Sequence, residues 1–182
     1  MIGISGGSGV VFALDLLKTL EPMPLETHLV ITKGAKQVVP TELSETVIDI
    51  EALADVVHKD SDLGASISSG SFRTEGMVIV PTSAGTLAKV AQGMTGNLVS
   101  RAAHVTLKER RPLVLVVREA PYSRPMLKNM LLAHDAGASI MPASPGWYHN
   151  PESITDLIAT ITSRTLDLLG IDNERAQRWK ES

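Results

Sequence analysis

The stretch that decides the fold is residues 1–20, MIGISGGSGVVFALDLLKTL. An apolar segment at 1–5 runs into Gly6, Gly7, Ser8 and Gly9, and an apolar pattern of helical spacing follows. This order predicts a strand, a tight turn and a helix, the first half of a βαβ unit. Backbone amides and the helix dipole converge at such a turn, so the glycines indicate either a phosphate or flavin site or only a tight connection.

Outward from this unit, short apolar segments alternate with helical patterns, which is typical of a parallel sheet with crossover helices. Strands are expected at residues 1–5, 28–32, 77–81, 113–117 and 139–141. Helices are expected at residues 9–20, 49–57, 85–92, 97–108, 124–133 and 151–169. Asn150 is expected to cap the last helix and Gly170 to end it. We therefore expect one α/β domain over residues 1–182, with the polar stretch 59–74 as a functional or interface loop.

Composition excludes several classes of function. The 17 basic and 20 acidic residues give a net charge of −3, and aromatic residues make up 3%, which argues against nucleic-acid binding and favours a small-molecule partner. The chain has no cysteine for a nucleophile or thiolate ligand, and its five histidines lack metal-ligand spacing, so we expect no metal. No apolar run approaches the ~20 residues that span a bilayer, and we expect a cytoplasmic protein without membrane contact.

A second loop of the same kind follows the predicted strand at 77–81. Thr82, Ser83, Ala84, Gly85 and Thr86 offer hydroxyls and amides ahead of a helix. Thr32 also ends a predicted strand, and in open α/β sheets such ends share one ligand site. The alternative is that Ser83 and Thr86 only cap a helix.

Charged residues at unusual positions complete the candidate site. Arg118 and Glu119 directly follow the strand LVLVV, where burial would raise the pKa of the glutamate and the arginine would lower it, although a structural ion pair is the alternative. Arg164 falls three residues after Ile161, which predicts a place on the apolar stripe of the last helix. With Arg101 and Lys108 it could clamp a phosphate, or these cations could complement helix ends and neighbouring charges.

Two further residues remain open at this level. Glu42 within PTELSET could be another carboxylate of the site or a surface residue. Tyr148, in SPGWYHNP before the last helix, could line a pocket or cover the core.

Motifs spread over nearly the whole chain resemble one family. They are ISGGSG, TKGAKQVVPTE, SSGSFRTEGMVIVPTSAGTLAKVAQG, NLVSRAAHVTLKERRPLVLVVREAPYS, NMLLAHDAGASIMPASPGWYHNP and SRTLDLLG. They are similar to the flavin prenyltransferases of the UbiX type, also known as the small subunits of phenolic or aromatic acid decarboxylases. The resemblance implies a flavodoxin-like (Rossmann-like) open parallel sheet with helices on both faces. It also implies a homo-oligomer, typically a dodecamer, with active sites shared between neighbours.

The resemblance further implies an activity and its residues. The family joins dimethylallyl monophosphate to reduced FMN without a metal, and passes the prenylated FMN to a UbiD-type decarboxylase. The residues implied to hold FMN are Gly6, Gly7, Ser8, Thr32, Ser83, Ala84, Gly85, Thr86 and Arg118. Those implied to hold the prenyl phosphate are Lys108, Tyr148 and Arg164, with Arg101 nearby. Ser8, Glu42, Lys108 and Glu119 are implied to serve catalysis, through proton handling and phosphate departure.

The sequence departs from the family pattern at a few positions. Thr82, Gly96 and His104 replace residues common in the family, and the stretch 59–71 lacks the tryptophan with which some members cover the site. Two other interpretations stay open. One is a non-catalytic FMN-binding or carrier protein, which would not need the charged residues above. The other is a flavin-dependent cysteine decarboxylase, whose essential histidine and PxMNxxMW motif are not visible here.

Overall fold

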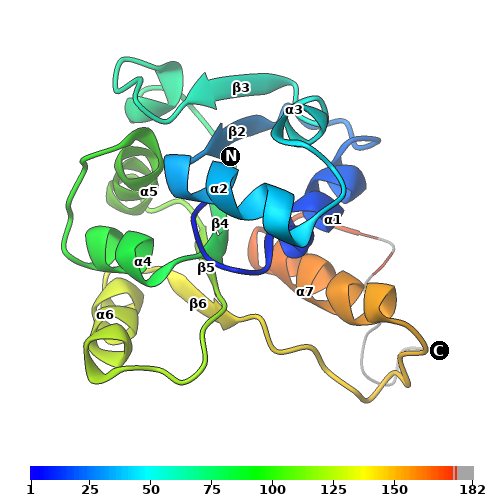
Figure 1. Ribbon diagram of the computed structural model, residues 1–182. Helices are drawn as coiled ribbons and strands as arrows, with labels where there is room; N and C mark the ends of the chain where they lie inside the picture. The colour runs from blue at the N-terminus through cyan, green and yellow to red at the C-terminus, as the bar shows by residue number, and fades with distance from the viewer. Residues whose placement is uncertain (174, 176–182) are drawn as a thin grey trace.

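A computed structural model describes residues 1–173 and 175, which form a six-stranded parallel sheet with helices on both faces (Figure 1). The strand order is β3-β2-β1-β4-β5-β6. The strands are β1 (Ile2–Ile4), β2 (His28–Ile31), β3 (Val56–Lys59), β4 (Met77–Thr82), β5 (Leu113–Val117) and β6 (Ser139–Pro142). The expected flavodoxin-like, Rossmann-like α/β fold is confirmed, and the doubly wound order places its switch point between β1 and β4.

The helices divide between the two faces of the sheet. They are α1 (Val10–Leu20), α2 (Lys33–Glu42), α3 (Val47–Glu51), α4 (Ala84–Ala91), α5 (Leu98–Lys108), α6 (Arg124–Asp135) and α7 (Ile154–Leu168). One buried cluster joins α1 and α7 to side chains such as Ile4 and Val116, and the other joins α4, α5 and α6 to Ile79 and Leu115 (Figure 1). Central strands buried on both faces explain why their sequences are continuously apolar.

The expected helix at 49–57 is wrong over its second half. The helix α3 ends at Glu51, and Val56–Lys59 pairs in parallel with His28–Ile31 as the edge strand β3. Burial alternates along β3, because one face packs on the core and the other meets solvent. The helix α2, which contains Gly34 and Pro40, was not predicted either. A short 3-10 helix at Ser66–Ser68 interrupts the polar stretch 59–74.

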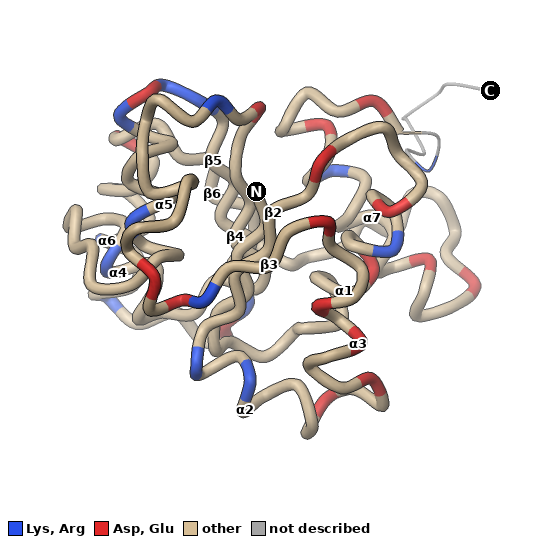
Figure 2. The backbone as a smooth tube through the Cα atoms, turned by 90° about the horizontal axis from the view of Figure 1, so that it is seen from above, with Lys and Arg blue, Asp and Glu red and all other residues tan. Residues whose placement is uncertain are grey.

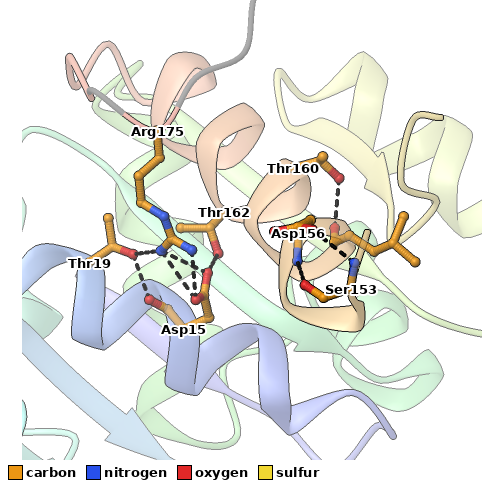
Figure 3. A network of polar contacts seen from close by, with 8 residues as sticks. Asp15, Thr19, Ser153, Asp156, Thr160, Thr162 and Arg175 are labelled. Carbon is orange, nitrogen blue, oxygen red and sulfur yellow. Dashed lines mark hydrogen bonds and ion pairs between the residues drawn. The ribbon is translucent and has the colours of Figure 1, made fainter. Parts of the chain in front are cut away.

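The last helix begins later than expected. Ser153 caps α7 by accepting a hydrogen bond from the amide of Asp156, so the predicted cap Asn150 is wrong (Figure 3). At the other end Gly170 has a φ of +72°, the left-handed conformation that ends helices, as expected. The helix is tied to α1 where the Thr162 hydroxyl donates to Asp15, which also pairs with Arg175 (Figure 3). No helix among residues 1–173 is long and apolar enough to cross a membrane.

Candidate active site

The crevice at the switch point lies between two loops at the carboxyl edge of the sheet. The strands β1 and β4 are neighbours in parallel register. Their following helices, α1 and α4, pack on opposite faces, so the loops after the two strands diverge above the sheet. Ligands of open α/β proteins bind in this position. The two loops singled out in the sequence, residues 6–9 and 82–86, therefore flank one site.

Ser5 connects the two loops. Its hydroxyl donates to the carbonyl of Pro81 (2.8 Å) and accepts from the amide of Ser83 (2.7 Å), and the residue is fully buried. From the sequence, Ser5 is only the end of a strand. The sequence shows only a polar residue at the carboxyl end of an apolar strand. The hydrogen-bond partners of Ser5, Pro81 and Ser83, lie 76 and 78 residues away along the chain.

The glycines of the first loop are required by close approach and by backbone conformation. A Cβ on Gly6 would lie 3.0 Å from the carbonyl carbon of Gly34, so the loop after β1 touches the backbone of the first turn of α2. Gly9 has a φ of +107°, which disfavours other residues. At the start of α4 the space beside Gly85 is open, because nothing lies within 4 Å of an added Cβ. The backbone at the start of α4 is thus accessible to a ligand, whereas the first loop is closely packed.

The amino end of α1 already holds an anion, which is a carboxylate of the chain. The Oε2 atom of Glu42, at the end of α2, accepts hydrogen bonds from the amides of Gly9 (2.8 Å) and Val10 (2.9 Å). Burial raises the pKa of Glu42, but hydrogen bonds from the Ser8 hydroxyl and the two amides, with the charge of Arg118, outweigh it and lower the pKa. Glu42 is therefore a carboxylate at neutral pH and serves as the cap that α1 lacks within its own segment.

Arg118 and Glu119 do not form the ion pair considered as an alternative. Arg118 donates from Nε to the carbonyl of Ser8 (3.1 Å) and lies beside the glycine-rich loop. Glu119 is exposed, and one of its oxygens accepts from the amide of Ala120 (3.1 Å). Among the described residues, no ion pair joins the two side chains. The expected burial of Glu119 is thus not provided by this chain.

The hydroxyls of Thr32 and Ser83 both cap helices, whereas that of Thr82 donates to the carbonyl of Ile79. Thr32 accepts from the amide of Ala35 (3.2 Å), and Ser83 accepts from the amide of Thr86 (3.3 Å) and donates to the Thr86 hydroxyl (3.1 Å). Capping uses one lone pair of each oxygen and does not exclude a ligand. Both interpretations of these residues are therefore compatible.

Two predicted phosphate ligands lie at opposite ends of α5. Lys108 ends α5 just before β5 begins, so it stands at the amino edge, and it pairs with Glu109. Arg101 lies in the first turn of α5, the end that binds Asp60 after β3, and donates from Nε to the carbonyl of Ser68 (3.0 Å). In Figure 2, α2 marks the carboxyl edge at the bottom, and basic residues gather at the opposite end, above the label of β5. A single chain does not bring Arg101 and Lys108 to the switch point.

Tyr148 and Arg164 are both on the surface. Tyr148 is 57% exposed and stacks edge-on with His149. The place predicted for Arg164 on the apolar stripe is wrong, because its side chain is 64% exposed and lies 3.5 Å from Asp167. The buried residues of α7 are Ile161, Thr162, Ser163, Thr165 and Leu166. Their direction is set by the packing of α7 on α1, which the sequence pattern does not contain.

Among the described residues, neither a further cavity nor a metal-binding cluster coincides with the switch point. A cavity of about 860 Å³ is lined by the end of α1, residues 22–25 and residues 169–173 with 175, but it shares no residue with the loops above. No group of three or more His, Cys, Asp or Glu side chains suited to a metal gathers in the part of the chain that the structure describes.

Comparisons with known proteins agree with this geometry. The Flavoprotein family model matches residues 1–165. Flavin prenyltransferase UbiX of Deinococcus radiodurans is 59% identical over 181 residues, covering 100% of this chain and 93% of that protein. The crystal structure of AnUbiX (PadA1) in complex with FMN and dimethylallyl pyrophosphate is 42% identical, with a TM-score of 0.96 over 100% of this chain and 96% of that one.

A second solved structure shows a similar match. A dodecameric FMN-dependent UbiX-like decarboxylase from Escherichia coli O157:H7 is 42% identical, with a TM-score of 0.95 over 99% of this chain and 98% of that chain. Similarity at this level extends over the whole fold, including both loops of the switch point. The chain belongs to the flavoprotein family and, within it, to the UbiX-like flavin prenyltransferases.

Proposed function

We propose that this chain transfers the prenyl group of dimethylallyl monophosphate to reduced FMN. The observation that carries the proposal is the crevice between β1 and β4, where the glycine-rich loop at 6–9, the segment at 82–86 with its capping hydroxyls, and Arg118 converge at the carboxyl edge. AnUbiX is described with FMN and dimethylallyl pyrophosphate bound, so the choice between a monophosphate and a pyrophosphate donor belongs to the proposal.

The residues of the crevice fit FMN. Open space beside Gly85 leaves the start of α4 accessible, and helix starts bind phosphate through their amides. Arg118 supplies a positive charge beside the loop. When bound in its reduced form, FMN supplies the nucleophilic ring nitrogen that accepts the prenyl group. The residues proposed to hold it are Gly6, Gly7, Ser8, Thr32, Ser83, Ala84, Gly85, Thr86 and Arg118.

Glu42 and Ser8 are proposed to handle protons and charge at the mouth of the crevice. Their hydrogen bond places a carboxylate next to the loop that holds the flavin. Because the pKa of Glu42 is lowered, it acts as a base or a fixed charge at neutral pH, and a proton donor must be another group. Glu119, exposed at the end of β5, is the residue proposed to protonate the departing phosphate.

The phosphate of the donor is proposed to be held across a subunit contact. Negative charge grows on the phosphate as the allylic C–O bond breaks, and cations placed there stabilise the transition state most. Lys108 stands at the amino edge and Arg101 is bound to the polar loop, so we propose that both reach the crevice of a neighbouring chain in a homo-oligomer, a dodecamer like the E. coli O157:H7 protein. Tyr148 and Arg164 would complete the clamp from exposed positions.

The product is proposed to leave for a UbiD-type decarboxylase, and the protein is proposed to work in the cytoplasm. A non-catalytic FMN carrier and a cysteine decarboxylase are the competing functions. The peptidyl-cysteine decarboxylase EpiD is 17% identical with a TM-score of 0.63, which shows the shared fold alone.

The test is anaerobic incubation of the purified protein with reduced FMN and dimethylallyl monophosphate, followed by mass spectrometry of the extracted flavin. A flavin heavier by one prenyl unit is the expected result. Unmodified bound FMN, with the D. radiodurans relative active in parallel, would contradict the proposed function and favour the carrier. A parallel sample with the pyrophosphate donor decides the choice of phosphate.

A further inference from the structure

The contact between Ser5 and the β4 loop occurs where the regular sheet pairing stops. The strands β1 and β4 pair in register only at Ile2 and Gly3, and the β4–β5 register shifts between Ile79 and Thr82. Beyond Gly3, the backbone and the hydroxyl of Ser5 both donate to the carbonyl of Pro81, at 3.3 Å and 2.8 Å. The spacing of the two loops at this point thus depends on a side chain as well as on one backbone hydrogen bond.

The same hydroxyl fixes the start of α4. It accepts from the amide of Ser83 at 2.7 Å, and Ser83 is the N-cap whose own hydroxyl contacts Thr86. Ser5 is 0% exposed, so water cannot replace the hydroxyl without a rearrangement. Loss of this oxygen would leave the partly buried amide of Ser83 without this partner, and the buried carbonyl of Pro81 with only the Ser5 amide.

We propose that Ser5 is a positioning residue for FMN, which holds residues 6–9 and 82–86 at the separation that the flavin requires. The inference rests on the proposed function only in naming FMN as the ligand of the crevice. Ser5 itself does not need to touch the flavin. It acts by keeping the binding-competent arrangement populated before binding, and a fall in that population weakens the apparent affinity by the same factor.

The experiment compares Ser5→Ala with Thr106→Val. Thr106 is also 0% exposed, and its hydroxyl donates to the carbonyl of Ala102 (2.8 Å) within α5, away from the crevice. Each variant is titrated with oxidised FMN by fluorescence quenching, and each is melted with and without FMN. We expect Ser5→Ala to raise the Kd for FMN about 10-fold, and Thr106→Val to leave it within about 2-fold.

A third variant covers the case in which Ser5→Ala does not fold. Ser5→Cys is nearly isosteric, but its thiol is a weak donor and acceptor, so we expect its Kd for FMN to lie between those of the wild type and Ser5→Ala. The increment in melting temperature that FMN produces should fall in the same order. A purely structural role would lower the melting temperature of the free protein and leave the Kd unchanged.

The outcomes separate this inference from the proposed function. Wild-type affinity for FMN in a folded Ser5→Ala or Ser5→Cys variant overturns the role of Ser5. An equal loss of affinity in Thr106→Val also overturns it, because the effect would then be general destabilisation. If the wild type binds FMN but transfers no prenyl group, the proposed function fails, and the role of Ser5 is still decided by the Kd values.

Discussion

At the carboxyl edge of the sheet, the loops assigned to the flavin contact one another within a single chain, whereas the cations assigned to the phosphate lie away from the switch point and contact a polar loop or neighbouring acidic residues. Ser5, Glu42 and Arg118 are linked to the switch-point loops by hydrogen bonds. Arg101 binds Ser68, and Lys108 pairs with Glu109. The difference is what the proposed shared site requires, in which one chain completes the flavin cradle and presents the phosphate ligands to a neighbour.

The largest effect is expected when a proposed phosphate ligand is removed in one chain and a proposed flavin ligand in another. Lys108→Ala removes a proposed phosphate ligand and should lower kcat/KM for the prenyl donor about 100-fold, since one electrostatic contact in a transition state has this size. Arg118→Ala should be similarly impaired through FMN. Co-expressed in equal amounts, the two variants should regain activity, because about a quarter of shared sites would combine an intact carboxyl edge with an intact Lys108.

The controls are each variant alone and a mixture prepared after the separate oligomers have formed. Anaerobic prenyl-transfer rates provide the measurement. Activity of the co-expressed mixture that does not exceed the mean of the single variants would show that each site is built within one chain.

A smaller effect is expected from disturbing the backbone contact between Gly6 and Gly34. Gly6→Ala places a Cβ about 3 Å from the backbone of Gly34, where no flexible side chain can yield. We expect a loss of about 1–3 kcal/mol in the free energy of unfolding, the usual cost of overpacking. Gly96→Ala is the matched control, because nothing lies within 4 Å of its added Cβ. Urea unfolding measures the free energy of unfolding of both variants. Equal stability of the two would refute the close approach of Gly6 to Gly34.

The pKa of Glu42 gives a still smaller effect that depends on pH. The folded protein lowers this pKa, so the carboxylate stabilises the fold above the ordinary glutamate pKa, and the contribution is lost as the pH falls through the lowered value. Glu42 is exposed, and a carboxylate at a helix start contributes about 0.3–1 kcal/mol. Glu42→Gln should therefore be less stable than the wild type by this amount at pH 7, and the difference should be smaller at an acidic pH below the ordinary glutamate pKa.

Unfolding curves at both pH values test this expectation, with Glu119→Gln as the control for an exposed glutamate that does not contact α1. A difference that persists or grows in acid would mean that the charge of Glu42 is not what holds the start of α1.

The sequence predicts the parts of the molecule whose causes are local. Strands such as Leu113–Val117 are recognised because burial on both faces requires an unbroken apolar run. The edge strand Val56–Lys59 is missed, since half-burial gives it a mixed pattern next to a helical one. Ser5 is missed for a different reason, because its role depends on Pro81 and Ser83 in a distant segment.

Arg164 shows where spacing arguments fail within a correctly predicted helix. The spacing groups Arg164 with Ile161 and Leu157, but Ile161 is buried beside Thr165 and Leu166, whereas Leu157 is half-buried and Arg164 is exposed. The direction that faces the core depends on how α7 packs on α1, and a single helix pattern does not contain that information. The same limit applies to Lys108, whose distance from the crevice follows from the sheet topology.

The smallest expected effect on stability belongs to Arg164. Its side chain is 64% exposed and lies 3.5 Å from Asp167, and exposed pairs of this kind contribute less than about 1 kcal/mol. Arg164→Ala should therefore change the free energy of unfolding by less than about 0.5 kcal/mol and leave the Kd for FMN unchanged. If the residue binds the donor phosphate, the KM for dimethylallyl monophosphate should rise about 10-fold with the fold intact. Unfolding and steady-state kinetics on one preparation separate the two roles, because a stability loss without a change in KM would make Arg164 a structural residue.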